Sequence, residues 1–217
     1  MSNLKCFKVE SNHKDSINFI FLHGYGANGR DLVGLSQQEE LKSLNANWYF
    51  LEAPLSPPEL AMFGGRAWFN LTLSSLGPNA DMRDFYDQEN REVEESFSLL
   101  KNSIWDLNID LKKTYIGGFS QGAMMASKLF FEAPSDYKGL ISFSGAPLHR
   151  KKWKLEDPES TQKVFLSHGM QDPVLPFQCA KDLDEKIKGF NKKTHWFNGQ
   201  HEIPYQVLKD LSEFISS

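Results

Sequence analysis

The segment Gly118-Phe119-Ser120-Gln121-Gly122 reads G-x-S-x-G and separates two stretches of different character. A short β-rich run, Thr114–Gly117, precedes it, and the helix-favouring run Ala123–Leu129 follows it. This order predicts a sharp strand-to-helix turn that presents the Ser120 hydroxyl as a nucleophile beside the positive end of a helix. Glycines two residues either side of Ser120 fit such a turn, because side chains there would clash.

A serine nucleophile needs a base, and the sequence favours His201 for that role. His201 directly follows the turn Asn198-Gly199-Gln200, and a loop after a strand lets an imidazole reach a neighbouring strand end. His195 is the alternative, but it lies inside the expected strand Thr194–Phe197, where its side chain should point to a face of the sheet.

The base in turn needs a carboxylate that holds its tautomer and stabilises the imidazolium. Asp172 lies in the loop after the expected strand Val164–Ser167. Catalytic groups of open α/β sheets gather at that carboxyl edge. The other interpretation of Asp172 is a turn or helix cap before Pro173. The chain order Ser120, Asp172, His201 differs from those of the chymotrypsin and subtilisin classes.

The developing oxyanion of such a reaction needs two backbone N–H groups. The residue after the nucleophile supplies one of them, which indicates Gln121. The second should come from the loop after an early strand, and Ile17–Leu22 leads into His23-Gly24-Tyr25-Gly26. We expect the N–H of Tyr25 to be this donor, because glycines on both sides let the backbone approach a ligand. We expect His23 to brace the loop rather than to act as a base.

Strand-like and helix-like segments alternate along the chain, which predicts an α/β fold with a mostly parallel sheet and helices on both faces. The expected strands are Ile17–Leu22, Trp48–Leu51, Thr114–Gly117, Leu140–Phe143, Val164–Ser167 and Thr194–Phe197, with Leu4–Val9 as a possible antiparallel edge strand. Apolar residues at helical spacing predict helices over Arg91–Leu107, Pro176–Gly189 and Pro204–Phe214.

The segment Pro57–Asp87 interrupts this alternation with proline turns, a Gly-Gly pair and many apolar side chains. A long apolar excursion of this kind is often functional, for example as a lid. It could equally serve only to cover a hydrophobic face of the core, and both roles are compatible.

Composition narrows the class of protein. A chain of 217 residues fits a single domain spanning 1–217. A net charge of −4 without long like-charge runs argues against nucleic acid as a partner. No apolar run is long enough to span a bilayer, and neither Cys6 nor Cys179 lies in a metal-ligand spacing. We therefore expect a cytoplasmic protein with no metal, no cofactor and no stable membrane insertion. No oligomeric state is predicted.

Several motifs together resemble the phospholipase/carboxylesterase family of α/β-hydrolases, which includes the acyl-protein thioesterases. The matching motifs are Leu22-His23-Gly24-Tyr25-Gly26, Arg66-Ala67-Trp68-Phe69, Gly117-Gly118-Phe119-Ser120-Gln121-Gly122-Ala123, Ser142 and Gly145, His168-Gly169-Met170-Gln171-Asp172-Pro173-Val174-Leu175-Pro176, and His201-Glu202-Ile203. They extend over nearly the whole chain, and those around Ser120 and Asp172 are the most specific.

The resemblance implies an α/β-hydrolase fold without a large cap domain. It also implies a triad of Ser120, Asp172 and His201, and it places Trp68 and Val174 near the acyl-binding groove. The chain departs from the family pattern at Ala27-Asn28-Gly29, where Asp is common after Gly26, and at Gln200, where a small residue is common. The segment 57–87 matches poorly beyond Trp68.

These observations predict a serine hydrolase that cleaves carboxylic esters of small or medium acyl chains through an acyl-enzyme. Two enzymatic alternatives are an acyl-protein thioesterase and a lysophospholipase. A ligand-binding module on a hydrolase scaffold is the non-enzymatic alternative, and such modules usually lack a member of the triad, whereas this chain retains all three.

Overall fold

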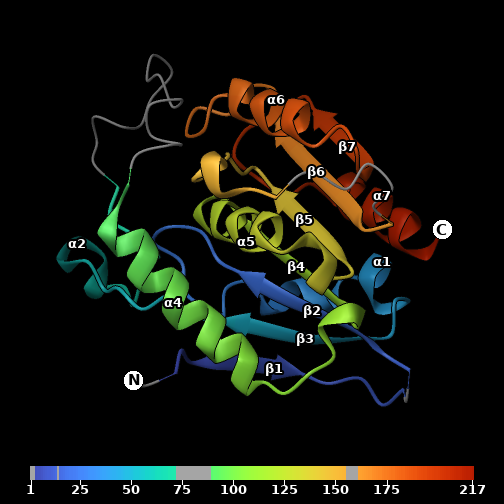
Figure 1. The fold of residues 1–217 in the computed structure, drawn as a ribbon, viewed down its shortest axis with the longest axis horizontal. Coiled ribbons are helices and arrows are strands. Elements are labelled where there is room, and N and C mark those ends of the chain that lie inside the picture. Colours follow the sequence, from blue (N-terminus) through green and yellow to red (C-terminus); the bar gives the residue numbers. More distant parts are fainter. Residues whose placement is uncertain (1–2, 14, 72–88, 155–160) are drawn as a thin grey trace.

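The computed structural model describes residues 3–13, 15–71, 89–154 and 161–217. These residues form a seven-stranded sheet of order β1-β3-β2-β4-β5-β6-β7 (Figure 1). The strands are β1 (Cys6–Val9), β2 (Ile17–Leu22), β3 (Ala46–Leu51), β4 (Thr114–Phe119), β5 (Gly139–Phe143), β6 (Lys163–Gly169) and β7 (Asn191–Phe197). Neighbouring strands pair in parallel except β1 and β3, which are antiparallel, so the predicted parallel sheet and its antiparallel edge strand are confirmed.

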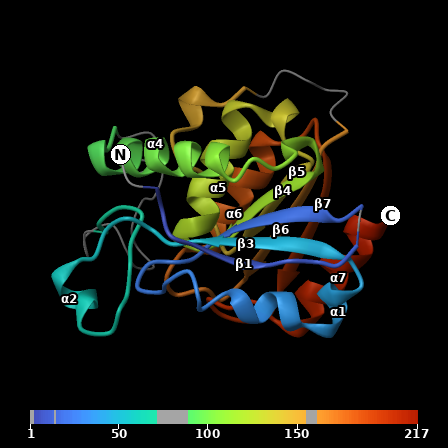
Figure 2. The same ribbon diagram turned by 90° about the horizontal axis from the view of Figure 1, so that it is seen from below.

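Helices cover both faces of the sheet, as the alternating pattern predicts. The α-helices are α1 (Glu39–Lys42), α2 (Pro58–Ala61), α4 (Arg91–Asp106), α5 (Gln121–Glu132), α6 (Phe177–Lys186) and α7 (Tyr205–Ser216), and the 3-10 helices are η1 (Val33–Gln37), η3 (Leu111–Lys113), η4 (Pro134–Asp136) and η5 (Arg150–Lys152). Helices α4, α5 and α6 pack on one face, and η1, α1 and α7 pack on the other (Figure 2). Helix α2 stands apart from both layers (Figures 1 and 2). No helix in the described ranges is long and apolar enough to cross a membrane.

The central strands are continuously apolar because both of their faces are covered. Every residue of β5 is buried, and β2 is buried except for its first residue. The outer strand β7 is only half-buried and begins at Asn191, three residues before the predicted Thr194. Its first three residues include Lys192 and Lys193, and the apolar pattern that predicts the strands does not extend to such charged residues. Lysine also occurs on the opposite edge, at Lys8 of β1.

The described part of the segment 57–87 contributes to the core. Trp68 and Phe69 are fully buried and join the cluster beneath α4 and α5. Met62 and Phe63, at the end of α2, are instead 86% and 84% exposed. Residues 72–87, on which the expectation of a lid also rests, lie outside the described residues.

Helix α5 is buried over almost its whole circumference, including the charged Lys128. The Lys128 ammonium lies 3.9 Å from the centre of the Phe97 ring and forms ion pairs with Glu94 and Glu132. A buried cation is tolerated only when such partners replace its hydration. This helix follows the predicted nucleophile, so its anchoring helps to keep the start of α5 in place.

Replacing Lys128 with Ala should lower the free energy of unfolding by about 3 kcal/mol, because a cavity forms at the buried site and Glu94 and Glu132 lose their cation. Urea denaturation measures this change. Lys101→Ala is the matched control, since Lys101 contacts the same Phe97 ring from the solvent side at 4.6 Å. The control should change stability by no more than about 0.5 kcal/mol. Equal losses in the two variants would contradict a special role for the buried cation.

Candidate active site

Ser120 occupies the turn between β4 and α5 in a strained backbone conformation. Its φ is 55° and its ψ is −121°, a region that non-glycine residues rarely adopt. The Ser120 N–H donates to the Phe143 carbonyl at 2.9 Å, and the Ser120 carbonyl accepts from the Met124 N–H at 3.1 Å. Hydrogen bonds to a neighbouring strand and to the first turn of α5 therefore hold the turn. Backbone strain of this kind clusters at functional sites.

The two glycines of the motif make this turn possible. A Cβ atom on Gly118 would lie 2.5 Å from the Gly122 carbonyl carbon. A Cβ atom on Gly122 would overlap the carbonyl oxygen of Leu22, the last residue of β2. The turn thus needs glycine at both positions, as the sequence predicts, and α5 begins in direct backbone contact with the end of β2.

Asp172 and His201 lie together at the carboxyl edge of the sheet. His201 Nδ1 is 2.6 Å from Asp172 Oδ2, and Asp172 Oδ1 accepts from the N–H groups of Val174 at 2.8 Å and Leu175 at 2.9 Å. Burial acts to raise the pKa of the Asp172 carboxyl. The hydrogen bond from His201 and the two backbone donors outweigh that effect, so the pKa lies below its usual value. Asp172 is therefore a carboxylate that can orient the His201 ring.

His201 also lies beside the residue that precedes the nucleophile. The His201 and Phe119 rings are 4.7 Å apart between centroids. The loops after β4, β6 and β7 therefore meet at one edge. Among the described residues no hydrogen bond joins the Ser120 hydroxyl to His201, and the proton transfer between them stays a prediction.

The alternative base, His195, has a different environment. Its Nδ1 lies 2.6 Å from Asp210 Oδ2 of α7, which packs on the face opposite α4, α5 and α6. Its side chain points to a sheet face, as expected for a residue within β7, and it serves to pair β7 with α7.

A second histidine, His168, contacts Asp172, and no role for it was predicted from the sequence. The strand β6 continues through His168 to Gly169, beyond the predicted end at Ser167. The His168 Nε2 atom lies 2.8 Å from the Leu175 carbonyl and 3.3 Å from Asp172 Oδ2. Burial lowers the pKa of the imidazole, so the neutral ring donates toward both oxygens. The i,i+4 spacing of His168 and Asp172 was the one available signal.

His23 braces the loop that contains Tyr25, as expected. Its Nδ1 lies 2.8 Å from the Gly24 carbonyl, and its Nε2 accepts from the Ala53 N–H at 3.0 Å. This pattern requires a neutral ring, and burial lowers the pKa of His23 accordingly. A Cβ atom on Gly24 would lie 3.3 Å from the Ser120 Cβ, so the loop passes directly beside the nucleophile.

The two expected oxyanion donors, Tyr25 and Gln121, directly follow the two residues in this contact, Gly24 and Ser120. Tyr25 follows Gly24, and Gln121 is the first residue of α5. In the part of the chain that the structure describes, the N–H of neither residue donates to a protein acceptor. The Tyr25 hydroxyl donates to Glu59 of α2 at 2.7 Å. Burial and this hydrogen bond raise the pKa of the phenol to about 12, so α2 is tied to the loop by a neutral tyrosine.

The two residues predicted near the acyl group differ in exposure. Val174 is 36% exposed, and Met170 in the same loop is 48% exposed, so apolar surface lies beside Asp172. Trp68 is fully buried, and its indole N–H donates to the His23 carbonyl at 2.9 Å. The structure thus places Trp68 behind the loop rather than on an open surface.

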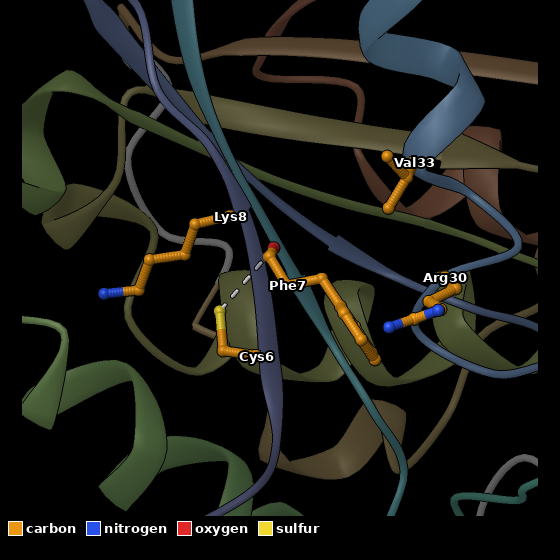
Figure 3. A pocket seen from close by; sticks show the side chains of 5 residues that line it. All are labelled: Cys6, Phe7, Lys8, Arg30 and Val33. Atoms are coloured by element: carbon orange, nitrogen blue, oxygen red, sulfur yellow. Dashed lines mark hydrogen bonds between the residues drawn. The ribbon is translucent and has the colours of Figure 1, made fainter.

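The groove drawn in Figure 3 is a separate feature at the β1 edge. It has a volume of about 520 Å³ and is lined by Cys6, Phe7, Lys8, Arg30 and Val33, none of which is a predicted site residue. The described residues contain no group of three His, Cys, Asp or Glu side chains placed to hold a metal ion.

Comparison with known proteins decides the family. The model of the Phospholipase/Carboxylesterase family matches residues 4–217. The chain belongs to this family. Members are hydrolases of ester or thioester bonds, and this protein is accordingly an enzyme of that class, with the α/β-hydrolase fold that its motifs predict.

Similar sequences and structures agree with the family assignment. Acyl-protein thioesterase 1 of Debaryomyces hansenii is 30% identical over 217 residues, covering 90% of this chain and 88% of that protein. Its counterpart in Eremothecium gossypii is 29% identical, covering 92% and 86%. The esterase PE8 superposes with a TM-score of 0.81 at 24% identity, covering 99% of each chain. The Bacillus cereus carboxylesterase has a TM-score of 0.75 at 20% identity, covering 98% of this chain and 93% of that one.

The lowered pKa of Asp172 predicts a specific dependence of stability on pH. The folded protein binds fewer protons at Asp172 than the unfolded chain does. This contribution to stability is therefore complete above the usual pKa of Asp and is lost as the pH falls through the folded pKa. Asp172→Asn should remove it, so the stability difference from wild type should shrink between roughly pH 5 and pH 3.

Urea unfolding at a series of pH values measures this difference. Asp106→Asn, at an exposed position of α4, controls for the loss of one negative charge. A wild-type-to-variant difference that stays constant over the whole pH range would show that the fold does not lower the pKa of Asp172.

Proposed function

We propose that this enzyme is a serine carboxylesterase that acts on small or medium acyl chains through an acyl-enzyme intermediate. The observation that carries the proposal is the 2.6 Å contact of His201 with Asp172 at the same sheet edge as the strained Ser120 turn. Acyl transfer by a Ser-His-Asp triad uses these residue types, and their chain order is that of the α/β-hydrolases.

In the first half of the reaction, Ser120 attacks the carbonyl carbon while His201 takes the hydroxyl proton. Asp172 keeps the Nδ1 proton of His201 directed toward itself, so that Nε2 is free to accept, and it stabilises the imidazolium that forms. His201 then gives its proton to the leaving alcohol or thiol, and the acyl group remains on Ser120. In the second half His201 activates water, which releases the acid and restores the serine.

The N–H groups of Tyr25 and Gln121 would hold the oxyanion of both tetrahedral intermediates. Each such donor stabilises the transition state by about 3 kcal/mol. Gln121 has a further advantage because it begins α5, where the positive end of the helix dipole favours negative charge. The acyl chain would run over the apolar surface at Val174 and Met170, with Trp68 contributing from behind the loop.

A thioesterase reaction is the second candidate, because two relatives at about nine-tenths coverage are named acyl-protein thioesterase 1. The triad and the oxyanion donors serve either bond, and a thiolate is a better leaving group than an alkoxide. Rates on matched esters and thioesters, from acetyl to palmitoyl, separate the two. We expect the highest kcat/KM on esters from the short or middle part of the series.

Other outcomes of that series favour the remaining alternatives. Selective turnover of long-chain thioesters would show that the enzyme is a thioesterase rather than an esterase. A steep rise in rate above the micelle threshold of a lysophospholipid would indicate a lysophospholipase. Inertness toward the whole series, together with absence of labelling by a fluorophosphonate, would indicate a binding module.

Replacing Ser120 with Ala should abolish labelling by a fluorophosphonate probe and lower kcat about 10⁴- to 10⁶-fold, as loss of a triad member does. The matched control is Ser127→Ala, which removes another buried serine hydroxyl, from the helix α5 that follows Ser120. It should keep both labelling and activity. Labelling that persists in Ser120→Ala would overturn the assignment of the nucleophile.

A further inference from the structure

The Gln121 side chain connects the nucleophile turn to a distant segment of the chain. Its Oε1 accepts from the Trp68 N–H at 2.8 Å, and its Nε2 donates to the Phe69 carbonyl at 2.7 Å. The side chain is 2% exposed, so the amide binds this backbone away from water. A buried amide with both ends bonded in this way holds two chain segments at a defined separation.

The same segment is bonded to the loop on the other side of the nucleophile. The Trp68 indole N–H donates to the His23 carbonyl at 2.9 Å, and the Trp68 and His23 rings are 5.6 Å apart. The Trp68 carbonyl accepts from Ser96 of α4 at 2.5 Å, so α4 also holds this segment. Trp68 therefore has hydrogen bonds to the start of α5, to the loop after β2 and to α4.

We propose that Gln121 and Trp68 are positioning residues that set the separation between the two oxyanion donors. Gln121 carries one donor on its own backbone, and the His23 carbonyl that Trp68 holds lies two residues before Tyr25, which carries the other. The continuous path Gln121–Trp68–His23 joins the two donors. The inference rests on the proposed function, because the separation of the two donors matters to the reaction only if they bind an oxyanion.

Packing alone does not account for these residues. Three polar contacts are made in a region where apolar side chains could fill the same volume without any need for hydrogen bonds. The contacts also end at the two segments that flank Ser120. A donor that moves by about 1 Å can lower the rate about 100-fold, so fixed separation has a direct effect on the transition state.

The test removes one hydrogen bond and keeps an aromatic side chain at this position. Trp68→Phe loses the indole N–H, and we expect kcat to fall about 10- to 100-fold while KM changes less than about twofold, since oxyanion contacts form in the transition state. Affinity for a transition-state analogue, a boronic acid or a trifluoromethyl ketone, should fall by the same factor. The pH profile of kcat/KM should keep its shape, because His201 and Asp172 are untouched.

Trp153→Phe is the matched control, because Trp153 likewise donates its indole N–H to a carbonyl, that of Leu148, at 3.0 Å. It should leave kcat and inhibitor affinity unchanged. Gln121→Glu is the second variant, which keeps the acceptor toward Trp68 and replaces the donor toward Phe69. It should lower kcat with KM nearly constant. If circular dichroism shows that Trp68→Phe is unfolded, Gln121→Glu alone tests the proposal.

The inference fails if Trp68→Phe and Gln121→Glu keep wild-type kcat, if they change KM alone, or if Trp153→Phe loses as much activity. Failure of the proposed function looks different. In that case the wild-type protein itself would resist labelling by a fluorophosphonate, or would still be labelled after Ser120→Ala.

Discussion

The first turn of α5 and the end of β2 approach so closely that no side chain fits between them at Gly122. This backbone contact has two consequences, because both segments continue into the candidate site. The chain before α5 must turn sharply, which forces Ser120 into its positive φ. The chain after Leu22 must pass beside Ser120, which brings the loop containing Tyr25 to the nucleophile. One close approach therefore places the proposed nucleophile and one expected oxyanion donor.

A similar contact places the other half of the site. A Cβ atom on Gly169, at the end of β6, would overlap the carbonyl oxygen of Gln200. The loops that carry Asp172 and His201 consequently leave the sheet side by side, and the short distance between the two side chains follows. Polar contacts then fix the carboxylate of Asp172, because His168 contacts its Oδ2 atom and two backbone N–H groups donate to its Oδ1 atom. The close backbone contacts at Gly122 and Gly169 thus position the segments that carry the proposed catalytic residues.

The nearness of Asp172 and His201 could be predicted because the carboxyl ends of parallel strands share one edge, and each residue follows such a strand. The sequence could not reveal the hydrogen bonds of the Gln121 side chain, whose partners lie 53 and 52 residues earlier. The role of His168 was hidden for another reason, because β6 continues past its apolar part. The burial of Lys128 was equally hidden, since a lysine in a helix pattern normally indicates solvent.

The sheet ends in two strands that both contain lysine, Lys8 in β1 and Lys192 and Lys193 in β7. The outer N–H and C=O groups of an edge strand form a template on which another chain can add a strand. A lysine on such an edge would have to lose its hydration or face a like charge when a second copy approached. Lys8 is exposed and carries this penalty on the β1 edge, whereas Lys192 and Lys193 are ion-paired with Asp184 of α6 and Asp210 of α7.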